Sequence, residues 1–145
     1  QSLIAEGTAN YGIEVAFPRA ERVEFERRVL FPAAGLKPEN AARYYEVLAL
    51  VDKLSYSGNE AARRYLDGRI DARAAADWME KYGLYSRPRA EQRVRFVEQY
   101  RSYVINYNLG RDMVAAYIES RGRDRWAEFA RLVSSPRLPS SLTSR

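Results

Sequence analysis

The sequence predicts an all-α fold: an irregular multi-helix bundle of about seven or eight helices, with no sheet. Apolar residues recur at spacings of three and four along most of the chain, and no segment alternates with period two. Proline, glycine and short polar residues interrupt these periodic segments, as helix ends require. Helix lengths and loops differ throughout, so no internal repeat is evident.

At 145 residues, the chain predicts one helical domain, residues 1–133, and a Ser/Pro-rich tail at 134–145 that we expect to be unstructured or loosely draped. No apolar run approaches the roughly 20 residues of a membrane helix, so we expect no membrane partner. The chain starts with Gln1, helical periodicity already runs at Leu3, and the sequence itself shows no signal-peptide pattern. We therefore expect this domain to be the C-terminal part of a longer protein, in a compartment that the sequence leaves open.

Cysteine and histidine are both missing from the sequence, and this excludes several kinds of chemistry for the chain alone. Disulfides, thiolate nucleophiles and Cys-ligated zinc all need cysteine. A Ser-His-Asp centre needs histidine, which is also the commonest metal ligand. Catalysis would have to depend on carboxylates and tyrosines, or on groups supplied by other polypeptide.

The net charge of +5 raises the question of nucleic-acid binding. Lysine occurs only at positions 37, 53 and 81, and arginine makes up the rest of the 24 basic residues. Most arginines are interleaved with Glu and Asp at helical spacing, which is typical of a solvated, ion-paired helix surface. Helix-turn-helix recognition is also disfavoured, because the segment DARAAADWMEKY is acidic to neutral. We expect no nucleic-acid partner.

The first half of the chain predicts four helices, separated by proline and glycine. Their approximate bounds are Ser2–Phe17, Pro18–Leu30, Pro38–Leu54 and Glu60–Leu66. The helix from Pro38 has apolar residues around most of its circumference, which predicts a central, buried helix. A turn at Ser55–Asn59 separates it from the short helix that follows, and Gly68 ends that one.

The second half predicts the remaining helices from cap residues. Their approximate bounds are Asp71–Tyr82, Ser86–Tyr107, Arg111–Ser120 and Asp124–Val133. The long helix from Ser86 carries an aromatic stripe: Phe96, Tyr100, Tyr103 and Tyr107. Such a stripe usually packs with its hydroxyls at the surface; alternatively, a phenol points into a cleft and stabilises an oxyanion.

The first helix carries the one polar arrangement that resembles a site. Glu6, Asn10 and Glu14 line up at i, i+4 spacing, so their side chains share one side of the helix. Small residues that would let a neighbouring helix approach lie beside them: Ala5, Ala9, Gly12 and Ala16. The line is either a surface edge paired with arginines or a set of carboxylate metal ligands, which suits zinc only when histidines join it.

Two segments carry a resemblance to a known family. EGTANYG at Glu6–Gly12 and YVINYNLGRDM at Tyr103–Met113 resemble motifs of a large, mostly helical group of bacterial gluzincin-like zinc metallopeptidases. In that group a His-Glu motif helix supplies two zinc-binding histidines and the catalytic glutamate. A later Glu-Gly-x-Ala-x-Tyr helix supplies the third ligand, which would be Glu6. A Tyr-x-x-Gly segment then lines the cleft, and its tyrosine would be Tyr107, followed by Gly110, with Tyr103 as a second candidate.

The resemblance implies a hydrolase whose site is only partly present in this chain, because the His-Glu helix is absent. Zinc would be the cofactor of the intact protein, and no cofactor is expected for this chain alone. The upstream part of the same protein would be the partner, and a homo-oligomer is a further expectation. The alternative is a non-catalytic helical interaction or scaffold domain.

Overall fold

The structure is a computed structural model that describes residues 2–122 and 124–143, so Gln1 and Arg123 of the predicted domain and residues 144–145 of the predicted tail lie outside it. Within these ranges the regular elements are all helical and no strand occurs, which confirms the all-α prediction. The α-helices are α1 (Ser2–Ala16), α2 (Arg19–Phe25), α3 (Phe31–Ala33), α4 (Ala41–Leu66), α5 (Ala72–Gly83), α6 (Arg87–Tyr100), α7 (Asn108–Glu119) and α8 (Arg125–Val133). A π-helical turn, η1 (Glu26–Leu30), joins α2 to α3, and the 3-10 turns are η2 (Pro38–Asn40), η3 (Arg101–Asn106) and η4 (Pro139–Leu142).

Six of the described helices have nine or more residues, fewer than the seven or eight predicted. The main reason is α4, which is one continuous helix where two helices and a turn at Ser55–Asn59 were expected. Side chains of this turn-prone segment are held by the start of α7: Asn59 donates to Asn108 Oδ1 at 2.8 Å, and Tyr56 donates to Asp112 Oδ2 at 2.6 Å. Tertiary contacts therefore override the local turn signal.

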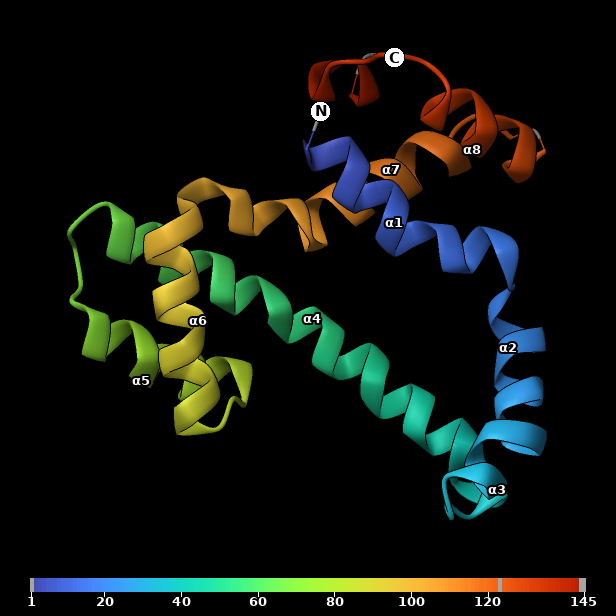
Figure 1. Cartoon of the computed structure of the whole chain (residues 1–145), viewed down its shortest axis with the longest axis horizontal. Coiled ribbons are helices and arrows are strands. Elements are labelled where there is room, and N and C mark those ends of the chain that lie inside the picture. Colours follow the sequence, from blue (N-terminus) through green and yellow to red (C-terminus); the bar gives the residue numbers. More distant parts are fainter. Residues whose placement is uncertain (1, 123, 144–145) are drawn as a thin grey trace.

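The helices form two packed regions, and η3 contacts the helices of both: α1 and α7 in one, α4 and α6 in the other. Figure 1 shows α5 and α6 beside one end of α4, α2 and α3 at its other end, and α1 crossing α7. Within the described part of the chain, no helix is long and apolar enough to cross a membrane.

The crossing of α1 and α7 depends on two glycines. A Cβ on Gly7 would lie 2.4 Å from the Gly110 carbonyl oxygen, and a Cβ on Gly110 would lie 2.6 Å from the Leu3 oxygen. Of the small residues expected to face a neighbouring helix, Ala5, Ala9 and Ala16 are exposed, whereas Gly12 faces α8, where a Cβ would lie 3.2 Å from the Phe129 ring. The core around this crossing consists of Ile4, Tyr11, Val15, Val114, Tyr117, Ile118, Leu132 and Leu142. Leu142 belongs to the predicted tail, so η4 is packed down rather than loose.

The second packed region covers the C-terminal half of α4. Its buried residues are mostly small: Ala61, Ala62, Ala75, Ala76, Met79, Ala90, Val94, Val97 and Val104. The chain reverses after α4 at Gly68, which has φ of +70°, and Asp71 caps α5 by accepting a hydrogen bond from the Ala74 N–H at 2.7 Å. These two local signals bring α5 back along α4.

The N-terminal half of α4 is not the buried helix that its apolar sequence predicted. Its large apolar side chains are 40–62% exposed: Tyr44, Val47, Leu48, Leu50 and Val51. In the same half of the helix, Ala41 and Tyr45 are buried. The prediction was wrong because α5, α6 and η3 cover the C-terminal half of α4, and the contact that α7 makes with the N-terminal half, Arg111 on Asp52, leaves these apolar side chains exposed.

The predicted long helix from Ser86 to Tyr107 ends earlier, at Tyr100. Arg101 takes φ of +52°, and the chain continues as the 3-10 turn η3. The expected interruption at Asn108–Gly110 is instead the beginning of α7. Because η3 packs against both α1 and α4, its Val104 is only 2% exposed and its Tyr103 reaches α1.

Candidate functional site

Glu6 and Tyr103 meet although they are 97 residues apart in the chain. The Tyr103 hydroxyl donates a hydrogen bond to Glu6 Oε1 at 2.6 Å, and both residues are partly exposed. The hydrogen bond to the carboxylate, together with partial burial and the negative charge of Glu6, raises the pKa of Tyr103 to about 12. This phenol therefore keeps its proton throughout the neutral range.

Tyr107 lies beside Tyr103 but faces a different hollow. The two rings make an edge contact with centroids 5.9 Å apart, and the Arg93 guanidinium lies 5.9 Å from the Tyr107 ring centroid. Tyr107 lines a pocket of about 340 Å³ together with Arg93 and Phe96, and neither Glu6 nor Tyr103 lines that pocket. The predicted residues thus form a chain of contacts, Glu6 to Tyr103 to Tyr107, rather than one cavity.

The other two residues of the Glu6 line do not join this group. Asn10 is exposed and donates its side-chain N–H to the Glu6 backbone oxygen at 2.8 Å. Glu14 is exposed near the end of α1 and lines a separate pocket. The shared side of α1 therefore does not create a cluster of carboxylate ligands.

The donor set of the chain does not make a zinc site by itself. Among the residues that the structure describes, no group of three or more His, Cys, Asp or Glu side chains is placed to hold a metal ion. Catalytic zinc sites use three protein ligands, and Glu6 would supply one. A metal at Glu6 would need ligands from outside this chain.

Comparisons of the chain with family models, curated proteins and solved structures find no match.

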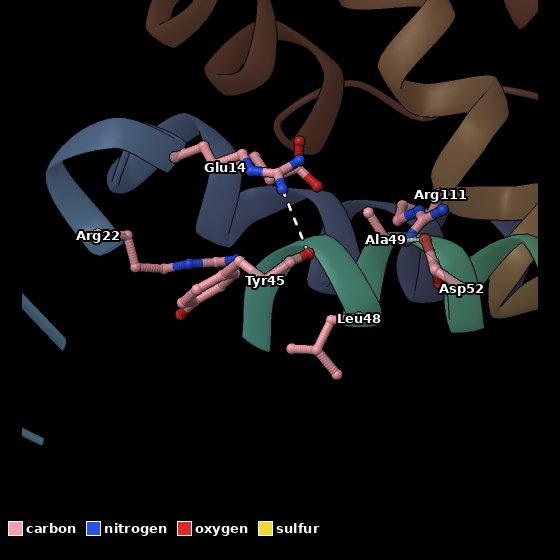
Figure 2. Close-up of a pocket in the computed structure, with 8 residues that line it drawn as sticks. Glu14, Arg22, Tyr45, Leu48, Ala49, Asp52 and Arg111 are labelled. Atoms are coloured by element: carbon pink, nitrogen blue, oxygen red, sulfur yellow. Dashed lines mark hydrogen bonds and ion pairs between the residues drawn. The ribbon is translucent and has the colours of Figure 1, made fainter. Parts of the chain in front are cut away.

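A pocket of about 340 Å³ lies where α1, α2, α4 and α7 meet (Figure 2). Its lining residues are Glu14, Arg19, Arg22, Tyr45, Leu48, Ala49, Asp52 and Arg111. Arg111 pairs with Asp52 at 2.6 Å, and Arg19 donates to the Tyr45 backbone oxygen at 3.3 Å. Arg111 thus joins α7 to α4 by an ion pair, whereas Arg22, the third cation of the pocket, pairs with Glu26 at 3.8 Å and has a buried Nε without a hydrogen-bond partner among the described residues.

Sequence reasoning missed this pocket, and it also missed the exposed face of α4. No spacing rule could have brought residues of four helices together. The apolar residues of α4 were recognised, but periodicity alone assigned them to the core.

Proposed function

We propose that this chain is the C-terminal helical portion of a zinc-metallopeptidase-like protein and that it is inactive alone. Glu6 would be one metal ligand and Tyr103 the phenol beside it, and Tyr107, the substrate-facing phenol that the resemblance implies, would act from the neighbouring pocket that it lines. The observation that carries this proposal is the 2.6 Å hydrogen bond between Tyr103 and Glu6. It joins the two segments that resemble the metallopeptidase motifs, although nothing in their spacing required them to meet.

The glycine crossing supports the same proposal independently. Gly7 follows Glu6 in the first motif, and Gly110 ends the Tyr-x-x-Gly sequence of the second. Each would collide with the other's helix if it carried a Cβ, at 2.4 Å and 2.6 Å respectively. The two motifs therefore use their glycines to hold α1 and α7 together, and this fixes the position of Glu6 relative to η3.

The two parts of the complete site would have different tasks. The upstream part of the protein would supply the histidines, since this chain contains none. A bound zinc ion acts as a Lewis acid toward a carbonyl oxygen. On this chain, Glu6 would offer a carboxylate oxygen, and Tyr103, whose pKa is about 12, would remain a hydrogen-bond donor at neutral pH.

Zinc analysis tests the proposal directly. We expect the isolated chain to hold no zinc, and the protein extended upstream to hold stoichiometric zinc that is lost in Glu6→Gln. Glu14→Gln is the matched control, because Glu14 lies on the same helix, is exposed, and has no contact with Tyr103. An extended protein without a His-Glu motif, or one whose Glu6→Gln variant keeps its zinc, overturns the proposal.

Tyrosine absorbance provides a second measurement, on the isolated chain. Tyr103→Phe should remove one group that titrates near pH 12. Glu6→Gln should move the Tyr103 pKa down toward its ordinary value of 10.0, because the neutral amide no longer favours the protonated phenol. Glu14→Gln should leave the titration unchanged. If Glu6→Gln also leaves it unchanged, the contact on which the proposal depends is not present in solution.

The exposed N-terminal half of α4 favours a second candidate, a non-catalytic helical interaction or scaffold domain. Exposure of large apolar side chains to water is unfavourable, and patches of side chains such as Leu50, which is 62% exposed, are typical of binding surfaces. For such a domain Glu6→Ala should cost little beyond a surface effect, and the upstream protein should bind no zinc. The zinc measurement therefore separates the two candidates.

A further inference from the structure

The exposed apolar residues of α4 lie on one face of the helix. Five residues, here called the α4 face, are linked in pairs three or four residues apart and are 40–62% exposed: Tyr44, Val47, Leu48, Leu50 and Val51. Four more exposed apolar side chains lie at the same end of the molecule, on α2, η1 and the loop after α3: Phe25, Val29, Leu30 and Leu36.

The area of this surface is that of an interface. The α4 face leaves on the order of 450 Å² in water, which by itself equals the largest patch on a typical monomer. With the four neighbouring side chains the total is roughly 800 Å², the area that one partner contributes to a standard protein interface.

The α4 face continues an interface that already exists within the chain. The same stripe runs on to Ala61, Ala62 and Tyr65, which α5, α6 and η3 cover. Helix α4 has 26 residues and α5 has 12, so at 1.5 Å per residue α5 is about 18 Å long and α4 about 39 Å. The stripe is therefore about twice as long as the helix that returns along it.

Arg43, Glu46 and Lys53 are charged residues beside the α4 face, and the last two indicate what covers it. Glu46 and Lys53 are seven residues apart, so they lie on the same side of the helix. Within the described residues neither has an ion pair, whereas Asp52 and Glu60 on the same helix are paired with arginines at 2.6 Å and 2.7 Å. One acid and one base, both unpaired and one heptad apart, complement the same pair on a helix that runs in the opposite direction.

We propose that two copies of this chain associate through their α4 faces, antiparallel, with the two-fold axis passing between Ala49 and Leu50. In this register Leu48 packs against Val51 of the second copy, and Glu46 lies level with Lys53 of the second copy. A parallel pair would instead set Glu46 level with Glu46, without that compensation. The proposal uses neither Glu6 nor Tyr103, so it can fail without affecting the zinc proposal.

Sedimentation velocity of the intact chain, from about 1 to about 100 μM, tests the association. We expect twice the mass of one chain at the high end of this range. Leu50→Glu should give the mass of one chain throughout, because it places a charge at the centre of the pair. Val133→Glu is the matched control: Val133 is 56% exposed on α8, outside the α4 face, and its replacement should leave the association unchanged. Circular dichroism confirms that each variant is folded.

The charge pair tests the orientation of the two copies. Glu46→Lys alone should weaken association at least tenfold, and adding Lys53→Glu should restore it, because each copy then presents the exchanged pair. A chain that has the mass of one copy at every concentration overturns the proposal, as does equal weakening by Leu50→Glu and Val133→Glu. A double variant that fails to recover overturns the antiparallel register.

Discussion

The two halves of α4 share one apolar stripe but have opposite surroundings. In the C-terminal half, Ala61 and Ala62 are 0% and 2% exposed against α5, α6 and η3. In the N-terminal half, Leu50 on the same helix is 62% exposed. The difference follows from what comes next in the chain, since Gly68 and Asp71 direct α5 back along one half only. Apolar periodicity thus identifies the face that needs cover, and topology decides whether the chain itself provides it.

The covered half of α4 has small residues at its contacts, whereas the uncovered half has large ones. The covered half contacts its neighbours through alanines, which let helix axes approach closely. Alanines also leave little apolar area for contact with a separate partner. The uncovered half presents Tyr44, Leu48 and Leu50, whose larger area suits contact with a separate partner. The uncovered N-terminal half is thus suited to association, whereas the covered C-terminal half is part of the folding core.

The largest difference is expected between truncating a side chain in the covered region and truncating one on the α4 face. Met79→Ala removes a side chain that is 1% exposed under the covered half, and it should lower the free energy of unfolding by about 2–5 kcal/mol. Leu50→Ala should change it by no more than about 0.5 kcal/mol. Urea unfolding followed by circular dichroism, at a protein concentration low enough for a monomer, measures both. Similar losses for the two variants would mean that the halves do not differ in burial.

Helix ends were predictable where a local signal decides them. Asp71 and Asp124 accept hydrogen bonds from the backbone N–H groups of Ala74 and Trp126, and each begins a helix as predicted. The prediction failed where distant contacts decide. Ser55–Asn59 stays helical because side chains of α7 hold it, and the burial of α4 depends on elements that its own sequence does not contain.

The candidate site was predictable only as separate parts. Glu6 stands out in a line of polar residues and Tyr103 in an aromatic stripe, and the resemblance gives both a role, but their hydrogen bond depends on the crossing of α1 and α7 and on the turn at Arg101. Periodicity had placed Tyr103 within a straight helix. A hydrogen bond between residues 97 positions apart lies beyond what spacing along one helix can indicate.

A smaller effect is expected from removing the N-cap of α5, the helix that covers the C-terminal half of α4. Asp71→Ala removes the cap of α5 and should lower the free energy of unfolding by about 1 kcal/mol. Its matched control is Asp67→Ala, which removes an exposed ion pair with Arg63, 3.3 Å long, and should cost less than about 0.5 kcal/mol. Hydrogen exchange should also increase in α5 for Asp71→Ala while the α1–α7 region is unchanged. Uniform acceleration across both regions would contradict the view that α5 is a separate cover.

The smallest effect is expected at Tyr56, where the two halves of α4 meet. Its hydroxyl donates to Asp112 Oδ2 at 2.6 Å, and burial, followed by this bond, raises its pKa to about 12. A pKa raised above the unfolded value stabilises the fold fully below about pH 10, and this stabilisation is lost as the pH rises toward 12. Tyr56→Phe should therefore cost about 0.5 kcal/mol at pH 8, and its difference from the unchanged chain should shrink by pH 11.

Tyr44→Phe provides the comparison for that measurement on the uncovered half. Tyr44 is 47% exposed on the α4 face, and its recorded contacts are made by its ring, with Phe31 and Tyr45. Removing its hydroxyl should leave stability unchanged at both pH values, because no hydrogen bond to the protein is lost. If Tyr44→Phe and Tyr56→Phe show the same loss and the same pH dependence, the link from α4 to α7 does not stabilise the helix at Ser55–Asn59. The continuity of α4 would then need a different cause.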